Sequence, residues 1–106
     1  MKISLVIPCY NEKQNLPRLI ERCETLVSKH SIEVILVDNG STDSSSEVIE
    51  EYPFIKLVRI EENQGYGYGI IQGLTQATGD ILSWTHADLQ TDPNDLIRGL
   101  VYFKTS

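Results

Sequence analysis

The sequence is short of positive charge, and the shortage is concentrated in one region. It has nine Lys and Arg against fifteen Asp and Glu, for a formal net charge of −6. Between Ile60 and Ile97 there is no Lys or Arg, although several Asp and Glu lie there. An acidic chain is a poor partner for nucleic acid, whose phosphates select basic surfaces. If this region handles a phosphate group, a bound metal ion must supply the positive charge.

Cysteines and long hydrophobic runs are also scarce. Cys9 and Cys23 have neither a metal-binding nor a disulfide spacing, so we expect reduced thiols in a cytoplasmic protein. The first apolar run, Ile3–Ile7, is too short for a signal peptide or a membrane span. With 106 residues, 41% of them hydrophobic and 23% charged, the sequence predicts one globular domain over residues 1–106.

Apolar strands and amphipathic helices alternate along the chain. Short apolar runs predict strands at 3–7, 33–37, 55–60 and 80–84. Helices are expected between them: after an N-cap at Asn15, after a capping box of Ser44 and Glu47, from Ile70 to a stop at Gly79, and after Asp92-Pro93 up to the chain end. The alternation predicts an α/β fold, a three-layer α/β/α sandwich around a sheet of four parallel strands.

Polar loops follow the predicted strands at 9–15, 38–43, 61–69 and 85–92. In parallel α/β sheets, ligands bind beyond the carboxyl ends of the strands. The glycines at 65, 67 and 69 do not form a dinucleotide-binding pattern, because Ile70 stands where a third glycine is needed. We interpret those glycines as a tight entry to a helix, and the four loops together as one site.

Three residues in the first two loops each allow two interpretations. Tyr10 could stack on a flat base and Glu12 could accept hydrogen bonds from a ribose, or the two could form an ordinary turn whose acid caps a helix. Asp38 ends an apolar strand, where an unpaired carboxylate is costly. Its partner is either the N–H groups of a base or the backbone of its own turn. Asp43 and Ser44 are interpreted as helix caps.

His86 and Asp88 follow the fourth strand in the region without Lys or Arg. Residues two apart in an extended segment face the same way. An imidazole and a carboxylate suit Mn²⁺ or Mg²⁺, with substrate oxygens and water completing the coordination. The sequence therefore predicts a divalent metal site here.

Four segments, in this order, resemble the family 2 glycosyltransferases with a GT-A fold, in particular the polyprenyl- or dolichol-phosphate sugar transferases. They are residues 4–12 (SLVIPCYNE), 37–43 (VDNGSTD), 63–67 (NQGYG) and 87–90 (ADLQ) with Pro93 after it. Two positions depart from the family pattern: Asn39 stands where a second Asp is usual, and His86 stands where the first acid of an Asp-any-Asp motif is expected.

The resemblance implies a Rossmann-like nucleotide-binding half of a GT-A fold and a role for each matching residue. The base and ribose of a UDP- or GDP-sugar would be held by Pro8, Tyr10, Glu12 and Asp38. Asp88, with His86 in the place of the other acid, would bind the metal, and Gln90 would lie near the phosphates. The reaction would transfer the sugar to an acceptor, such as a lipid phosphate, in cell-wall or glycolipid biosynthesis.

The resemblance covers only the donor half. The acid that acts as general base would lie beyond Ser106, so we expect little turnover from this chain alone. We also expect the full-length protein to associate with the cytoplasmic face of a membrane, and the exposed sheet edge to allow a homo-oligomer. Two other classes stay open: a sugar nucleotidyltransferase-like enzyme, although the first loop lacks the expected basic glycine-rich motif, and a non-catalytic nucleotide- or metal-binding module. A regulatory domain with Asp38 as phosphoacceptor lacks the expected Lys.

Overall fold

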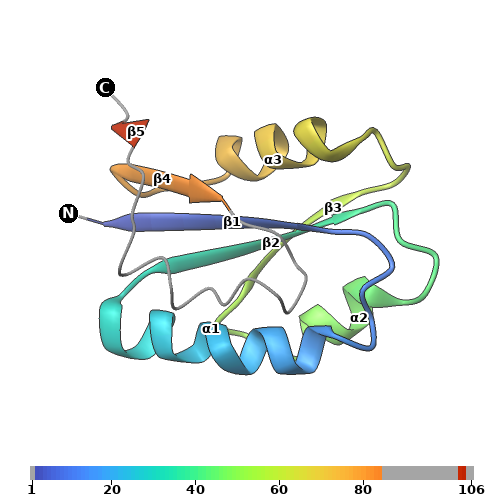
Figure 1. Ribbon diagram of the computed structural model, residues 1–106, viewed down its shortest axis with the longest axis horizontal. Coiled ribbons are helices and arrows are strands. Elements are labelled where there is room, and N and C mark those ends of the chain that lie inside the picture. Colours follow the sequence, from blue (N-terminus) through green and yellow to red (C-terminus); the bar gives the residue numbers. More distant parts are fainter. Residues whose placement is uncertain (1, 85–102, 105–106) are drawn as a thin grey trace.

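Five strands form one sheet in the order β3-β2-β1-β4-β5. The computed structural model describes residues 2–84 and 103–104 (Figure 1). The strands β1 (Ile3–Cys9), β2 (Glu33–Asn39), β3 (Lys56–Ile60) and β4 (Ile81–Trp84) are parallel, and β5 (Phe103–Lys104) runs antiparallel to β4. The predicted four-stranded parallel sheet is confirmed, with β5 added at one side.

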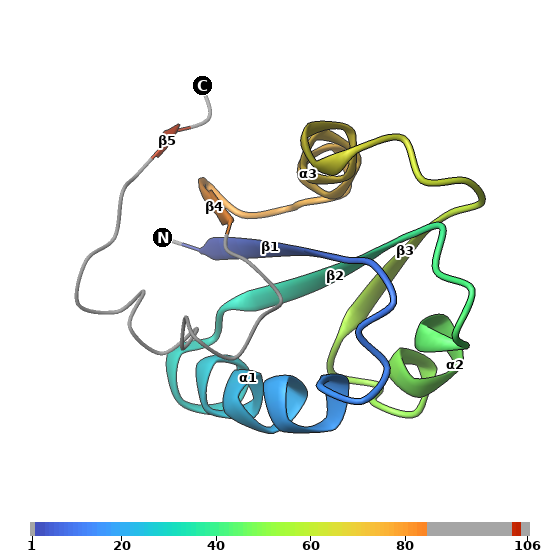
Figure 2. The ribbon, with the colours of Figure 1, turned by 45° about the vertical axis from the view of Figure 1, so that its right-hand side comes forward.

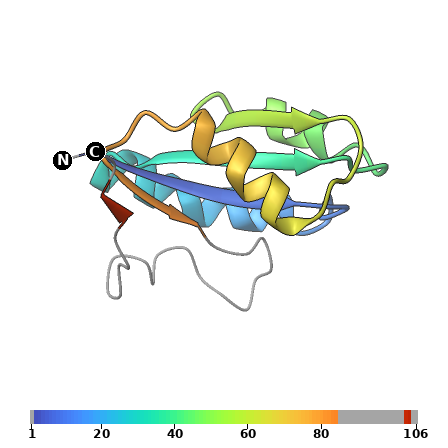
Figure 3. The ribbon, with the colours of Figure 1, turned by 90° about the horizontal axis from the view of Figure 1, so that it is seen from above.

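The helices cover both faces of this sheet. Figures 1 and 2 show α1 (Leu16–His30) and α2 (Ser45–Glu50) on one face and α3 (Tyr66–Thr75) on the other. Seen from above, α3 crosses the middle of the sheet over β1 and β2 (Figure 3). The predicted three-layer α/β/α sandwich is therefore confirmed.

Alternation along the central strands separates two apolar cores. Leu5 and Ile7 of β1 are fully buried with the apolar face of α1, whereas Val6 is buried on the α3 side. Successive strand residues face opposite sides of the sheet, so a strand covered on both faces is apolar throughout. Helix α3 approaches this surface closely, because a Cβ atom on its Gly73 would overlap the side chains of Val6 and Val37.

The first strand is longer than the sequence predicts. We expected it to end at Pro8, but β1 continues to Cys9 and pairs with β2 at both positions. Its ladder with β4 runs only from Ile3 to Val6. Pro8 therefore lies past the β4 ladder, where a missing N–H is tolerated as it is at the margin of a sheet.

Ser44 stands at the predicted N-cap position of α2 but does not cap it with its side chain, and the predicted end of α3 is wrong. Ser44 has a left-handed φ of 68° and makes no side-chain cap, so the expected capping box does not form. Asp43 caps α2 instead, because its Oδ1 accepts from the N–H of Ser45 at 3.1 Å. Helix α3 ends at Thr75, so Gly79 does not stop it.

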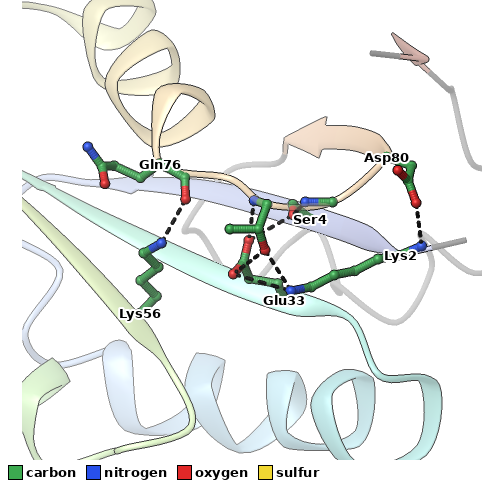
Figure 4. Close-up of polar contacts among 8 residues, drawn as sticks. Lys2, Ser4, Glu33, Lys56, Gln76 and Asp80 are labelled. Atoms are coloured by element: carbon green, nitrogen blue, oxygen red, sulfur yellow. Dashed lines mark hydrogen bonds and ion pairs between the residues drawn. The ribbon is translucent and has the colours of Figure 1, made fainter. Parts of the chain in front are cut away.

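Gly79 has a different role, beside Ser4 and Lys2 at the amino ends of the strands, and Figure 4 shows the side chains of Ser4 and Glu33 in this region. The Gly79 N–H donates to Ser4 Oγ at 2.9 Å, and a Cβ atom there would lie 2.8 Å from the Lys2 carbonyl oxygen. Glu33 Oε1 accepts from the Ser4 hydroxyl at 2.8 Å and from the Thr78 N–H at 2.9 Å. These contacts hold the start of β4 beside β1.

The end of the chain also differs from the prediction. We expected the chain to end within a helix, but Phe103 and Lys104 form β5 and pair with Leu82 and Ile81. The sheet edge that we expected to be exposed is thus covered at these two residues of β4. The helix predicted after Asp92 lies outside the described residues. Within the described part of the chain, no helix is long and apolar enough to cross a membrane.

Candidate functional site

Three loops come together at the carboxyl ends of the parallel strands, at the right of Figure 1. They are the β1–α1 loop (residues 10–15), the β2–α2 loop (40–44) and the β3–α3 loop (61–65). Because β1, β2 and β3 are adjacent and parallel, their carboxyl ends lie at the same edge. Three of the four loops that the sequence predicts to meet at one edge therefore do so.

Asn11 joins the first loop to the second. Its backbone N–H donates to Ser41 Oγ at 2.9 Å, and its Oδ1 accepts from the Thr42 N–H at 2.8 Å. Asn11 has a left-handed φ of 51°, a conformation that Asn tolerates better than most residues. One further bond, from the Lys13 N–H to Asp43 Oδ2 at 3.1 Å, completes the junction.

Asp38 lies at the end of β2 and is only 3% exposed. Its Oδ1 accepts from the Ser41 N–H at 3.0 Å, and its Oδ2 accepts from the Ser46 hydroxyl. These are the contacts expected if Asp38 bonds its own turn, which was one of the two interpretations. They satisfy the buried carboxylate. The role of Asp38 toward a nucleotide base stays a prediction.

Glu12 forms hydrogen bonds within the protein, whereas the Tyr10 side chain is exposed. Glu12 Oε2 accepts from Asn15 Nδ2 at 2.8 Å, and its carbonyl oxygen accepts from the Asn15 and Leu16 N–H groups at the start of α1. Tyr10 is 47% exposed. A cavity of about 360 Å³ is lined by Asp43 and residues 11–15, Glu12 among them. The loop thus presents an aromatic ring and a polar cavity at the edge.

The acidity of two groups at this edge is shifted. Burial raises the pKa of the Cys9 thiol, and the nearby Asp38 and Glu12 carboxylates raise it further. Cys9 therefore stays a neutral thiol, which makes it a poor nucleophile and a poor metal ligand. Burial acts to raise the pKa of Asp43, but hydrogen bonds from Ser45 and Lys13 outweigh it and lower the pKa.

The sequence analysis identified Asn39 only as a departure from the family pattern, but in the structure its side chain bonds residues far along the chain. Its side-chain amide contacts two residues of the third loop: Nδ2 donates to the Gly65 carbonyl oxygen at 2.8 Å, and Oδ1 accepts from the Gln64 N–H at 3.2 Å. The next residue, Gly40, has a φ of 74° and packs against Glu62 and Asn63. The Asn-Gly pair was a signal of a tight turn only, since partners about 25 residues away leave no local pattern.

The predicted metal ligands His86 and Asp88, and the predicted phosphate neighbour Gln90, lie outside the described residues. Strand β4 leads toward them, ending at Trp84 beside Val6 of β1. Among residues 2–84, no group of three His, Cys, Asp or Glu side chains is placed to hold a metal ion. The Asp38 carboxylate in particular is used by protein donors.

A family model and curated relatives match this sequence. The model of glycosyl transferase family 2 matches residues 4–105, and the chain belongs to that family. Two similar proteins are undecaprenyl-phosphate 4-deoxy-4-formamido-L-arabinose transferases. The one from Proteus mirabilis is 41% identical, with 92% of this chain and 32% of the relative covered. The one from Pseudomonas savastanoi pv. phaseolicola is 36% identical, with 91% and 31% covered.

Solved structures of glycosyltransferases are also similar to this chain. The mannosyltransferase PcManGT from Pyrobaculum calidifontis, in complex with GDP-Man and Mn²⁺, superposes with a TM-score of 0.76 at 25% identity, covering 90% of this chain and 30% of that chain. S. aureus TarS in complex with UDP superposes with a TM-score of 0.73 at 28% identity, covering 83% and 28%. The fold is that of GT-A glycosyltransferases. The chain spans about a third of the length of the curated relatives it matches.

Proposed function

We propose that this chain is the donor-binding part of a glycosyltransferase that takes a sugar from a UDP- or GDP-sugar and transfers it to a lipid phosphate. The observation that carries the proposal is the meeting of three polar loops at the carboxyl edge of a family 2 domain. Ligands of such sheets bind at this edge. Residues 1–106 then form one truncated GT-A domain.

The base and ribose would be held by the first two loops. Tyr10 offers an exposed ring for stacking, and Pro8 is the second-to-last residue of β1, two positions before it. Glu12 keeps a second carboxylate oxygen beside the polar cavity, where it can accept from ribose hydroxyls. Asp38 can receive a base N–H through the remaining lone pairs of its oxygens, because a carboxylate accepts about four hydrogen bonds.

The metal would be held by Asp88 and His86, with Gln90 near the phosphates. An aspartate oxygen and an imidazole nitrogen are a donor set that fits Mn²⁺, and substrate oxygens would complete it. The ion would supply charge stabilisation for the departing nucleoside diphosphate. Two observations support this metal site. Hydrogen bonds within the protein already use the carboxylates of Asp38 and Asp43, and no Lys or Arg lies between Ile60 and Ile97 to neutralise a phosphate instead.

The acceptor and setting follow from the relatives by analogy. Their names specify undecaprenyl phosphate, so we propose a polyprenyl phosphate acceptor for the whole protein, at the cytoplasmic face of a membrane. Cys9 and Cys23 are buried and form no disulfide, which fits a reducing compartment. The general base would come from sequence beyond Ser106, so this chain should bind the donor but show little transfer. Association of copies through the sheet would involve the part of β4 beyond the β5 pairing.

Calorimetric titration tests the donor site. UDP and GDP are titrated into the 106-residue chain with and without Mn²⁺, and one of them should bind only with the metal. Asp88→Asn should weaken that binding by about 10-fold or more, since it removes a charged ligand. Asp95→Asn removes the same charge from nearby sequence and should leave the affinity unchanged. Lack of metal-dependent binding by the unmodified chain would refute the proposal.

A further inference from the structure

Helix α1 carries a stripe of positive charge. Arg18, Arg22 and Lys29 stand at positions i, i+4 and i+11 of the helix, and such positions lie on one face. The three cations span about 16 Å along the axis, at a rise of about 1.5 Å per residue. Thr25 stands at position i+7 on the same line, and no acid of α1 does. Arg18 and Lys29 are exposed and Arg22 is half-buried, so the stripe reaches the surface.

The rest of the chain is strongly acidic. Residues 13–29 contain four of the nine Lys and Arg but only two of the fifteen Asp and Glu. The remaining residues hold five cations against thirteen acids. Helix α2 lies on the same face of the sheet as α1 and has Glu47 and Glu50 exposed (Figure 2). Positive charge is therefore concentrated at α1, and an anionic surface attracts the molecule in one orientation.

The charge of Arg18 does not serve the stability of α1. Arg18 lies in the first turn of the helix, where the helix dipole favours acids and disfavours cations, and this turn contains no acid. In the part of the chain that the structure describes, the side chains of Arg18 and of Glu21, one turn later, form no ion pair or hydrogen bond. Bonding within the described residues thus gives no reason for a cation at this position.

A cavity of about 370 Å³ opens on the stripe. It is lined by Arg18, Glu21, Arg22 and Thr25. Two guanidinium groups and a hydroxyl are donors that suit the oxygens of a phosphate, and a guanidinium can bind a phosphate through two parallel N–H groups. Glu21 is the one acid among these four residues, so the lining keeps an excess of positive charge.

We propose that the outer side of α1 docks on a membrane surface that carries anionic lipids. Lipid phosphates lie along the stripe, and one headgroup occupies the cavity between Arg18 and Arg22. Each cation that reaches the headgroups raises the affinity about 5-fold. The acids elsewhere in the chain oppose docking, but at about 0.1 M salt charges are screened beyond about 10 Å. The inference goes beyond the proposed function, because it requires neither a nucleotide nor a metal.

Docking through α1 brings the candidate site to the bilayer. Helix α1 begins directly after the β1–α1 loop, one of the three loops at the carboxyl edge, and Arg18 lies in its first turn. For the lipid phosphate acceptor of the proposed function, the phosphate then lies at the level of the headgroups beside that edge. The exposed apolar side chains of Tyr68 and Ile71 belong to α3, on the other face of the sheet (Figure 2).

Vesicle flotation tests the docking surface. The 106-residue chain is mixed at low salt with vesicles of phosphatidylcholine alone, or of equal parts of phosphatidylcholine and phosphatidylglycerol. It should float with the mixed vesicles and stay in solution with the neutral ones. Salt at about 0.5 M should abolish the binding, because it screens the charges. Lack of binding to the mixed vesicles at low salt, or binding that resists salt, would overturn the proposal.

Arg18→Gln combined with Lys29→Gln removes the two exposed cations of the stripe. The matched control is Lys56→Gln combined with Arg59→Gln, which removes two exposed cations from the edge strand β3 and gives the same net charge. The stripe variant should bind the mixed vesicles about 25-fold more weakly than the unmodified chain, and the control less than about 3-fold more weakly. Equal losses would show attraction through overall charge and would refute docking through α1.

The fluorescence of Trp84 reports the orientation of the docked chain. Trp84 is the only tryptophan, and it pairs with Val6, which is buried on the α3 side, so it faces away from α1. Brominated lipids should leave its fluorescence unchanged, whereas quenching would show that the α3 face enters the bilayer and would overturn the proposal. Urea unfolding checks that both double variants are folded, and salt dependence and quenching of the unmodified chain decide the question if one of them is not.

Discussion

The parallel strands give the sheet an amino edge, where the strands begin, and a carboxyl edge, where they end. Both edges are rich in hydrogen bonds, but a carboxylate is central at the amino edge and amide side chains are central at the carboxyl edge. At the amino edge, the single carboxylate of Glu33 gathers donors from Ser4, Thr78 and Lys2 (Figure 4). At the carboxyl edge, the side chains of Asn11 and Asn39 each bond the backbone of a neighbouring loop. A carboxylate can only collect donors, whereas an amide can be placed between a donor and an acceptor.

This difference distinguishes the amino edge, which anchors the start of β4, from the carboxyl edge, which carries the candidate site. The amino edge fixes where β4 begins and uses its carboxylate entirely for that purpose. The carboxyl edge is also held firmly, but it keeps Tyr10 exposed and has a cavity lined by Asp43 and residues 11–15. Recognition requires groups that are both held in place and accessible. Substitutions at the amino edge should therefore change stability alone, and substitutions at the carboxyl edge should change stability and nucleotide binding.

The largest effects are expected from adding a methyl group to a glycine at each edge. Gly40→Ala combines a φ of 74° with overlap against the backbone of Asn63, and Gly79→Ala overlaps Ser4 Oγ and the Lys2 carbonyl. We expect Gly40→Ala to lower the free energy of unfolding by about 3–4 kcal/mol and Gly79→Ala by about 2–3 kcal/mol, measured by urea unfolding.

The comparison is sharpened by measuring nucleotide affinity for both glycine variants under conditions in which they stay folded. Gly40→Ala should weaken metal-dependent binding, because the second and third loops meet at Gly40. Gly79→Ala should bind like the unmodified chain. Weakened binding in both variants, or in neither, would contradict the division of the two edges into an anchor and a site.

Removing the main carboxylate of each edge should have the next largest effect. Asp38→Ala leaves the Ser41 N–H and the Ser46 hydroxyl without their acceptor in a buried position, so a loss of about 2–3 kcal/mol is expected. Glu33→Ala should cost about 1–2 kcal/mol, because its side chain is 18% exposed and water can replace part of the contact. Chemical denaturation of the two variants measures both values, and a larger loss for Glu33→Ala would reverse the ranking.

The sequence predicted the class of fold because it carries a periodic signal. Apolar runs such as Leu5–Ile7 and the helical spacing of Leu16, Leu19 and Ile20 are local, and both were confirmed. Boundaries were less predictable. Whether β1 passes Pro8 depends on how far the β4 ladder extends, which is a property of a strand more than 70 residues away.

The site was predictable in its position but not in its connections. Three of the polar loops predicted after parallel strands do meet at one edge, and the location of the site there stays a prediction. The bonds that hold the edge together join Asn11 to Thr42 and Asn39 to Gly65, pairs separated by 31 and 26 residues. No local sequence pattern predicts a hydrogen-bond partner that lies so far away along the chain. Gly79 is a similar case, since its small size is required by the backbone of Lys2 and Ser4 and not by the helix before it.

Lowering the pH should reduce the stability that carboxylates contribute at both edges. Burial acts to raise the pKa of Glu33, but bonds from Thr78 and Ser4 and the charge of Lys2 outweigh it, so the pKa is lowered, as it is for Asp43 at the other edge. A carboxyl whose folded-state pKa is lowered contributes stability above its unfolded-state pKa and loses that stability as the pH falls through the folded-state value.

Glu33→Gln tests this at the amino edge. Glutamine keeps one acceptor oxygen but cannot titrate, so the variant should be less stable by about 1 kcal/mol near pH 7 and nearly equal to the unmodified chain near pH 3. Urea midpoints at the two pH values give the comparison. Asp43→Asn should behave in the same direction, and a stability gap that is unchanged by acid would contradict the assignment of the lowered pKa.

The smallest effect is expected for the ion pair of the amino edge. Lys2 Nζ lies 3.8 Å from Glu33 Oε2 and donates to Thr78 Oγ1 at 2.6 Å, and the Lys2 side chain is 49% exposed. Lys2→Met should cost less than about 1 kcal/mol, and added salt should reduce the difference because it screens exposed charges. Lys56→Met is the control, since Lys56 Nζ donates to the Gln76 carbonyl oxygen, an uncharged acceptor. Its small effect should depend less on salt, and equal salt dependence of the two variants would show that the Lys2–Glu33 charge pair adds nothing to the hydrogen bonds around it.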